Sequence, residues 1–308
     1  MQTLKANGKL LISGEYAVID GALALAIPTR FGQNLTVSYS EKETEFPILY
    51  WEAFLHNQEV WFTAEWELKS LKLLKTSHSK LAGKLNKILL AIEQLKPNFF
   101  NDQNQDIRCS TTLDFPKNWG LGSSSTLISL LAQWIQLDAF ELNRLTFQTS
   151  GYDIACAEAK TPIFYQRKNE KSMIEEVQLS SKITENLFFV HLNQKQDTQK
   201  SVTQHYKNVS KDKDWLNLIS TLTYNISRTE SKEEFEILVI AHEEIIASKI
   251  GLPKVKDVYF PDYEGIVKSL GAWGGDFVMI TAHGDFKNYF HSKGFTTILS
   301  FNELFGQI

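Results

Sequence analysis

The chain has 308 residues, a length typical of about two domains, and 43% of them are hydrophobic, which is enough for a sizeable core. This composition excludes a disordered, collagen-like or low-complexity chain. The 32 Lys and Arg against 36 Asp and Glu give a net charge of −4, so the basic excess typical of nucleic-acid-binding proteins is absent.

Cysteine content and the start of the chain indicate the cellular setting. Cys109 and Cys156 are too few for a disulfide framework and match no zinc-ligand spacing, so we expect both to be buried small hydrophobic residues. The first nine residues lack the apolar stretch of a signal peptide, and no window reaches the roughly 18 apolar residues of a membrane span. These features predict a cytoplasmic protein without a membrane or nucleic-acid partner.

The first third of the chain has the period-two alternation that predicts strands. Strands are expected at 9–13, 34–40 and 59–68. In the last of these, Val60, Phe62, Ala64 and Trp66 share one face. We interpret Trp51, Trp61 and Trp66 as part of a strand face in the core rather than as a stacking platform for bases. Apolar residues then recur at three- and four-residue steps over 81–95, which predicts a helix that ends before Pro97.

A glycine- and serine-rich loop follows the strand expected at 106–114. An apolar helix is expected directly after it at 127–137, a second helix at 141–149 and a third from Gly151. The charged run 167–171 is interpreted as a solvated turn and as the domain boundary.

The second half of the chain mixes strands and helices without strict alternation. Strands are expected at 162–166, 187–192, 277–282 and 296–301, and helices at 214–228, 233–250 and 263–270. A glycine turn, 271–275, separates the last of these helices from the strand after it. This mixture predicts an α+β fold rather than a doubly wound parallel sheet.

The loop from Gly120 to Ser125 combines residue types that bind an anion. A strand, a glycine loop and a helix in this order present backbone N–H groups and the positive end of a helix dipole. Gly120 and Gly122 let a ligand approach the backbone, and Ser123, Ser124 and Ser125 add hydroxyl groups. The loop matches neither the Walker pattern nor the dinucleotide fingerprint. An ordinary glycine turn with a serine N-cap is the alternative interpretation.

Two further segments place a charged residue beside small ones. Segment 7–18 surrounds a short apolar strand with Lys9, glycines and Glu15, and segment 150–153 puts Asp153 at the start of a small-residue helix. Taken alone, Lys9 fits a surface lysine, and Asp153 fits an acid that the helix dipole favours in the first turn.

Together these three segments resemble the signatures of the GHMP kinases, the small-molecule kinases that include galactokinase, homoserine kinase, mevalonate kinase and phosphomevalonate kinase. The resemblance covers nearly the whole chain in the right order, including the glycine turn 271–275. Gly-Leu-Gly-Ser-Ser at 120–124 and Gly-Glu-Tyr-Ala-Val at 14–18 carry it most specifically. The second is similar to the mevalonate-pathway members, and Tyr16, where mevalonate kinases tend to have histidine, favours phosphomevalonate kinase.

The resemblance implies a two-domain GHMP kinase fold of the α+β class. Its N-terminal domain, 1–168, would bind ATP and carry the catalytic residues, with the phosphate loop between a strand and a helix. Its C-terminal domain, 169–308, would be an α/β sandwich-like domain that closes over the substrate. We expect a monomer or homodimer whose partners are ATP and a small-molecule substrate.

The activity implied is phosphorylation of a small metabolite with ATP and Mg²⁺, with phosphomevalonate or mevalonate in isoprenoid precursor synthesis as the expected acceptor. Two alternatives stay open: a kinase of the same fold acting on a sugar, a sugar phosphate or homoserine, and a non-catalytic relative that senses a ligand. Lys9, the glycine–serine loop and Asp153 are all intact, which favours an enzyme. Segment 150–153 fits the kinases better than a decarboxylase relative of the same fold.

The resemblance gives a role to each matching position. Asp153 would act as general base or orient the acceptor, and Lys9 would lie near it and keep it ionised. The ATP phosphates would be held by Gly120, Leu121, Gly122, Ser123, Ser124 and Ser125. Ser124 would bind Mg²⁺, with Glu141 as the candidate for a second ligand.

The substrate side of the implied site is less specific. The residues expected to contact substrate are Glu15, Tyr16, Ser150, Gly151 and Thr198. Thr198 fits equally well as an N-cap of the helix that follows. Asn7 stands where the family usually has proline, and the C-terminal glycine turn contains Trp273 and ends in Asp276, where small residues are usual. We expect Trp273 to have a packing role.

Overall fold

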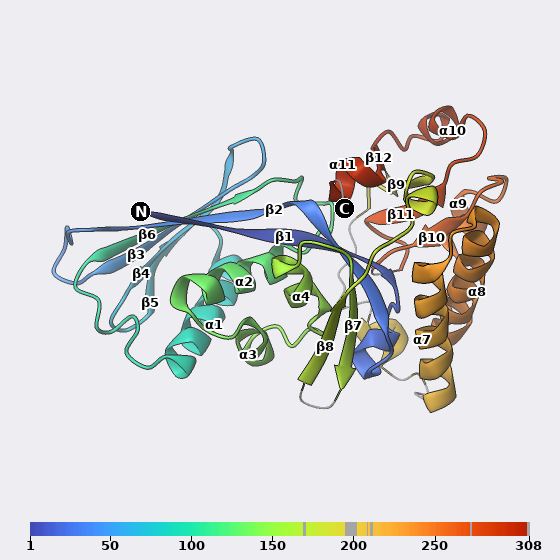
Figure 1. Ribbon diagram of the computed structural model, residues 1–308. Coiled ribbons are helices and arrows are strands. Elements are labelled where there is room, and N and C mark those ends of the chain that lie inside the picture. The colour runs from blue at the N-terminus through green and yellow to red at the C-terminus, as the bar shows by residue number, and fades with distance from the viewer. Residues whose placement is uncertain (169–170, 195–201, 208, 210–211, 272, 307–308) are drawn as a thin grey trace. The chain divides into compact units, whose positions relative to one another are not determined.

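The computed structural model describes residues 1–308 except 169–170, 195–201, 208, 210–211, 272 and 307–308. The described chain forms two compact units that interleave along the sequence. The first unit comprises Met1–Gly8, Phe31–Lys117 and Gly122–Glu158, and the second comprises Lys9–Arg30, Asn118–Leu121 and Ala159–Ile308. Two long strands contribute residues to both units (Figure 1). The domain limits expected from the sequence, 1–168 and 169–308, stay a prediction.

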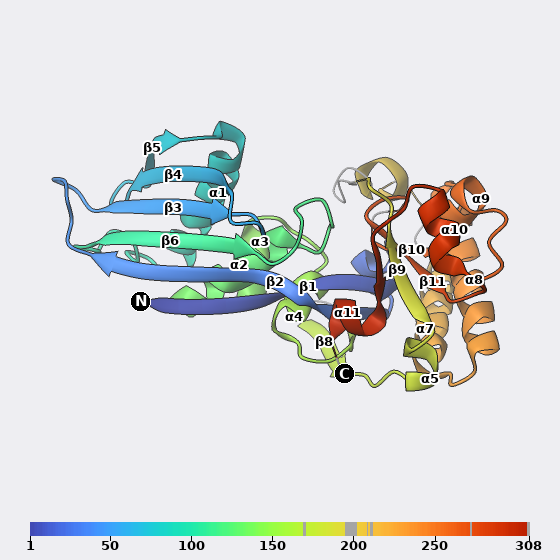
Figure 2. The same ribbon diagram turned by 90° about the horizontal axis from the view of Figure 1, so that it is seen from above.

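The first unit contains a mixed sheet in the order β5-β4-β3-β6-β2, with β1 also pairing with β2 (Figure 2). Its strands are β1 (Gln2–Ser13), β2 (Ala24–Ser40), β3 (Ile48–Phe54), β4 (Val60–Glu67), β5 (Lys72–Thr76) and β6 (Asp106–Leu113). β3 and β6 run parallel, whereas β3–β4, β4–β5 and β2–β6 are antiparallel. A parallel pair needs a long connection, and the helix between β5 and β6 lies within it.

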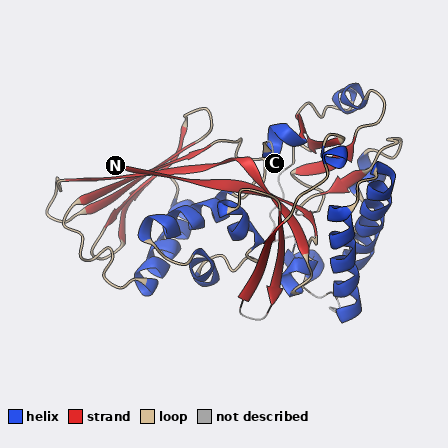
Figure 3. Ribbon diagram, in the orientation of Figure 1, coloured by secondary structure: helices blue, strands red, loops and turns tan. Residues whose placement is uncertain are grey.

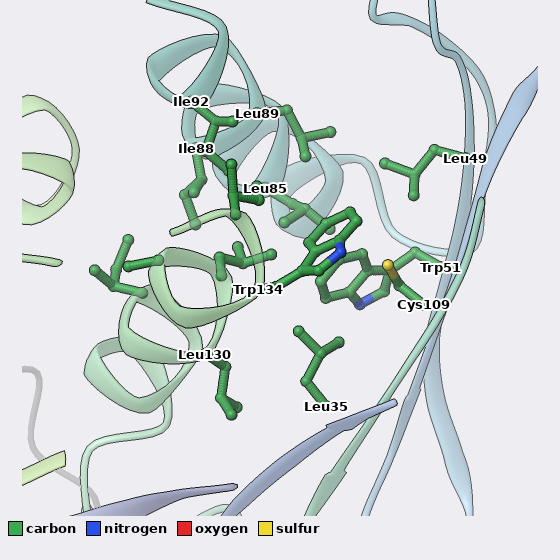
Figure 4. Close-up of a cluster of buried hydrophobic side chains, with 14 of the residues drawn as sticks. Leu35, Leu49, Trp51, Leu85, Ile88, Leu89, Ile92, Cys109, Leu130 and Trp134 are labelled. Carbon is green, nitrogen blue, oxygen red and sulfur yellow. The ribbon is translucent and has the colours of Figure 1, made fainter. Parts of the chain in front are cut away.

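Helices cover one face of this sheet (Figure 3). They are α1 (Ser79–Leu95), α2 (Ser123–Ile135), α3 (Ala139–Leu145) and α4 (Tyr152–Glu158). Figure 4 shows how strand residues such as Trp51 and Cys109 meet Leu85 and Leu89 of α1 and Trp134 of α2 in one hydrophobic core. Both cysteines are buried, as predicted.

Most elements expected in this part of the chain form, and the exceptions have a physical cause. β3 was not predicted, because its less buried face carries the aromatic residues Tyr50 and Phe54 beside Glu52, so alternating burial is not matched by a polar alternation in the sequence. β5 was missed because it is a short, mostly exposed edge strand. The helix expected at 127–137 begins earlier, at Ser123, directly after the glycine loop.

The second unit contains a four-stranded antiparallel sheet in the order β10-β11-β9-β12. These strands are β9 (Leu187–His191), β10 (Val267–Ser269), β11 (Phe277–Thr281) and β12 (Ile298–Ser300). Two long helices, α7 (Lys213–Arg228) and α8 (Lys232–Ile250), pack against each other (Figure 1), and α8 also packs on β10. The shorter elements are η1 (Ala17–Asp20), α5 (Ser181–Thr184), the π-helical turn η2 (Val202–Tyr206), α9 (Val255–Tyr259), α10 (Phe286–Ser292) and α11 (Phe301–Phe305).

Two paired strands lie on either side of residues 169–170, within the charged run that we interpreted as a solvated turn. Strands β7 (Ile163–Lys168) and β8 (Lys171–Glu176) pair across it, with Lys168 opposite Lys171. The start of β2 pairs with β7 in the same unit. Within the described part of the chain, no helix has the length and apolar character needed to cross a membrane.

Two predictions near the C-terminus were wrong. Residues 263–270 form a loop and β10 instead of a helix, because Val267 and Lys268 pair with Ile280 and Met279 of β11. Strand β12 ends at Ser300, and Phe301 already belongs to α11. Ser300 and Glu303 form a capping box there, a helix-start signal that the sequence contains. The α+β class itself is confirmed.

Leu89 and Leu90 of α1 offer a matched test of the core in Figure 4. Leu89 is 0% exposed and Leu90 is 52% exposed. We expect Leu89→Ala to lower the free energy of unfolding by about 2–5 kcal/mol, because it leaves a cavity in a packed core. Leu90→Ala should change it by less than about 0.5 kcal/mol. Urea denaturation measures both, and equal losses would contradict this core assignment.

Candidate functional site

Lys9 lies on β1 and is held against the glycine loop. Its backbone N–H donates to Leu121 O at 3.0 Å, and its Nζ donates to Gly120 O at 3.2 Å. The side chain is half-buried. Lys9 is therefore not a solvated surface lysine, because its ammonium group is anchored at the start of the loop.

Gly120 is the point where the loop meets Asp276. Gly120 has φ +66, and an added Cβ would lie 2.0 Å from Asp276 Oδ2. Only glycine fits here, because a side chain would collide with the carboxylate. Asp276 itself has φ 54 and is 9% exposed, and its N–H donates to Gln194 O at 2.8 Å. The structure thus brings together Lys9, Gly120 and Asp276, the last of which the sequence marked only as a departure from the family pattern.

The other half of the loop forms the start of α2. Its N-cap is Gly122, which has φ 92 and provides no side-chain cap. The alternative interpretation, a serine N-cap, is therefore wrong. Ser124 is exposed, whereas Ser125 is buried and its hydroxyl donates to Gly122 O at 2.8 Å. The first N–H groups of a helix have no partner within the helix, so this end of α2 suits an anion such as a phosphate.

Asp153 lies in the first turn of α4, as predicted. Its Oδ1 accepts a hydrogen bond from the hydroxyl of Thr149 at 2.9 Å and from the N–H of Ile154 at 3.2 Å. Gly151, just before the helix, is buried with φ 98, and Ser150 is half-buried. The contacts of Asp153 hold its carboxylate in one orientation. Thr149 was missed because a threonine before a helix is common and carries no specific signal.

Glu15 belongs to a buried charge cluster that also includes His242 and Glu243 of α8 and Lys268 of β10. Lys268 Nζ donates to Glu15 Oε1 and lies 3.8 Å from Glu243 Oε2. His242 Nε2 accepts the N–H of Gly14 at 3.0 Å and lies 3.6 Å from Glu15 Oε2. Glu15 is thus buried in this ion pair, and the substrate contact expected for it stays a prediction.

Burial dominates the titration of this buried charge cluster. It raises the pKa of Glu243 to about 7 and raises the pKa of Glu15 above its usual value, while Lys268 opposes both shifts. Burial and the nearby Lys268 lower the pKa of His242 well below its usual value, so this imidazole is neutral. The cluster therefore combines an ammonium group with carboxylates that resist ionisation.

Tyr16 and Trp273 pack in one buried hydrophobic cluster. The Tyr16 ring lies 5.5 Å from that of Tyr206, and both belong to the buried cluster that contains Trp273. The indole N–H of Trp273 donates to Pro253 O at 2.8 Å. The packing role expected for Trp273 is confirmed, and Tyr16 shares it.

Two remaining site residues gain no ligand-binding geometry from the structure. Thr198 lies outside the described residues. The Glu141 carboxylate pairs with the Arg144 guanidinium at 2.7 Å on an exposed part of α3. Across the described ranges, no group of three or more His, Cys, Asp or Glu residues could hold a metal ion.

Sequence comparisons and structure comparisons give different results for this chain. Neither models of protein families nor curated proteins match its sequence. Solved structures do match its fold over nearly its full length.

Three of these structures show the range of the match. Phosphomevalonate kinase of Streptococcus pneumoniae, in complex with phosphomevalonate and AMPPNP, has a TM-score of 0.69 at 16% identity over 97% of this chain and 100% of its own. Mevalonate kinase of Methanococcus jannaschii has a TM-score of 0.62 at 17% identity over 95% of this chain and 94% of its own. Galactokinase of Lactococcus lactis, in complex with galactose, has a TM-score of 0.62 at 12% identity over 97% of this chain and 92% of its own. The chain has the fold of the GHMP kinases.

Proposed function

We propose that this protein transfers the γ-phosphoryl group of ATP to a small metabolite, with phosphomevalonate or mevalonate as the acceptor. The observation that carries the proposal is the loop 120–125. Lys9 donates a hydrogen bond to its first residue, and α2 begins within it without a side-chain cap. Phosphoryl transfer needs this kind of positive, preorganised surface more than it needs covalent chemistry.

The loop residues would bind the phosphates of ATP. ATP supplies the phosphoryl group when bound. The N–H groups at the start of α2 would donate to phosphate oxygens, and Gly122, which has no side chain, leaves them uncapped. The exposed hydroxyl of Ser124 suits Mg²⁺, which prefers oxygen ligands and keeps most of its waters. We carry Ser124 alone forward as a metal ligand, because Glu141 is paired with Arg144.

Lys9 and Asp153 would take the two charge-handling roles. The Lys9 ammonium group would neutralise charge on the transferred phosphoryl group. Asp153 would orient the acceptor and accept its proton, with Thr149 holding the carboxylate in place. If the acceptor is itself a phosphate, its oxygen is mostly ionised near neutral pH and proton removal matters less.

Two lines of support favour a mevalonate-pathway acceptor. The S. pneumoniae enzyme, which shares this fold, is crystallised with phosphomevalonate and AMPPNP. The segment Gly-Glu-Tyr-Ala-Val at 14–18 is also similar to the mevalonate-pathway kinases.

An ADP-release assay with Mg-ATP tests this function directly. We expect release with phosphomevalonate or mevalonate and none with galactose or homoserine, because the acceptor pocket must match both shape and charge. Release with a sugar alone would overturn the acceptor assignment. No release with any acceptor, together with no binding of AMPPNP, would overturn the kinase proposal.

Asp153→Asn tests the proposed base. With an alcohol acceptor we expect turnover to fall about 100-fold or more, because the amide cannot accept the proton. With a phosphate acceptor the loss should be smaller. The matched control is Glu158→Gln, which removes an exposed carboxylate at the other end of the same helix and should leave turnover unchanged. Near-normal turnover of Asp153→Asn with mevalonate would contradict the assignment.

Gly120→Ala tests the packing of the phosphate loop. The added methyl group would collide with Asp276, so we expect AMPPNP affinity to fall about 10-fold or more. The double variant Gly120→Ala with Asp276→Gly removes the collision and should recover part of the affinity. Gly83→Ala is the control, because a Cβ there meets no atom within 4 Å. Calorimetry measures each affinity, and unchanged binding by Gly120→Ala would contradict this geometry.

A further inference from the structure

We propose that His242, Glu243 and Lys268 are positioning residues for the phosphate loop, which they orient by holding two turns: the one that follows the strand of Lys9 and the one that leads to Asp276. This inference rests on the proposed kinase function. None of the three residues lies in the loop. They act through the backbone of the two turns.

The first turn follows β1, the strand that carries Lys9. Gly14 has φ 90 and Tyr16 has φ 60, so the chain reverses through two left-handed residues. A Cβ at Gly14 would lie 2.9 Å from Ala24, which leaves the turn little freedom to shift. The N–H of Gly14 donates to His242 Nε2 at 3.0 Å. His242 therefore fixes the end of the strand from which Lys9 reaches Gly120.

The second turn leads from β10 to Asp276. The N–H of Ser269 donates to Glu243 Oε1 at 2.9 Å, directly before the glycine turn. Asp276 ends that turn in a left-handed conformation and presses its carboxylate against Gly120. Neighbouring residues of α8 thus hold both turns, and the residues on their far sides, Lys9 and Asp276, both meet Gly120.

Lys268 makes this arrangement possible. Its Nζ binds Glu15 in the first turn and donates to Ser269 O in the second at 2.9 Å. The ammonium group also lies 3.8 Å from Glu243. One buried cation therefore links both turns to α8, and its removal would leave carboxylates buried without a counter-charge.

An apolar core would serve stability at least as well, which argues for a geometric role. Replacing a buried ionic group by packed hydrophobic residues is often neutral or stabilising. Within the described residues, His242 Nδ1, Glu15 Oε2 and Glu243 Oε2 have no hydrogen-bond partner. Such a cluster costs free energy, so its distinctive contribution is to supply acceptors and charge at defined points of two turns.

The protonation state of His242 agrees with this role. An Nε2 atom that accepts a hydrogen bond places the imidazole proton on Nδ1. Burial and Lys268 lower the pKa of His242, so the acceptor persists well into the acidic range.

The kinetic test compares His242→Leu with His242→Gln. Leucine removes the acceptor for the Gly14 N–H, and we expect the KM for Mg-ATP to rise about 10-fold with a smaller change in kcat. Glutamine keeps an acceptor oxygen and should restore most of the affinity. The control Glu244→Gln changes an exposed residue of α8 two positions after His242 and should behave as the wild type. Equal KM values in His242→Leu and wild type, or no rescue by glutamine, would overturn the proposal.

A spectroscopic test needs no activity. Long-range ¹⁵N–¹H spectra of the wild-type protein should show His242 protonated on Nδ1 only, and His242→Gln should shift the Gly14 amide resonance. A proton on Nε2 would overturn the positioning contact. If His242 is protonated on Nδ1 only but the protein neither binds AMPPNP nor releases ADP, the kinase proposal fails. The positioning role proposed for His242, Glu243 and Lys268 then fails with it, while the contact between Gly14 and His242 stands.

Glu243→Gln gives a pH-dependent test of the same cluster. Lys268, Ser269 and Glu15 face this carboxylate. Its pKa of about 7 exceeds the ordinary 4.5, so the folded protein holds a proton that the unfolded chain releases. The wild type should therefore lose stability relative to Glu243→Gln as pH rises from 5 to 7. Melting temperatures of the two proteins at several pH values measure this difference in stability. A pH-independent difference would overturn the buried placement of Glu243.

Discussion

The buried ammonium group of Lys268 is the constraint on which the second unit depends. A lysine without solvent must have a counter-charge, and Glu15 and Glu243 supply it from segments far apart in the sequence. This requirement forces the turn after β1, helix α8 and strand β10 to meet at one point. Hydrophobic burial alone is non-directional and could not fix these three backbones so closely.

The same constraint bears on how an acidic protein could bind a polyanion. The chain carries a net charge of −4, so positive potential must be concentrated locally. In the structure it is found at Lys9, whose ammonium group is tied to Gly120, and at the start of α2, where Gly122 leaves the backbone N–H groups uncapped.

The sequence predicts local features of fold and site well and long-range ones poorly. The helix near 81–95 and the helix after the glycine loop follow from periodicity alone. The helix predicted at 263–270 was wrong because pairing with β11, rather than local spacing, decides the structure of these residues. Likewise Lys9 and Asp153 carry recognisable local signals, whereas His242 looks like any histidine on a helix until its contact with Gly14 is known.

The left-handed residues explain why the site departs from local rules. Tyr16 and Asp276 adopt φ 60 and φ 54, which costs a side-chain-bearing residue roughly 1–2 kcal/mol each. Both are buried, so flexible solvent-exposed turns cannot account for them. Contacts with their surroundings must offset the strain. Tyr16 packs in the buried hydrophobic cluster, and Asp276 forms backbone hydrogen bonds with Leu192 and Gln194. Strain that persists in a packed interior marks positions where geometry is selected over stability.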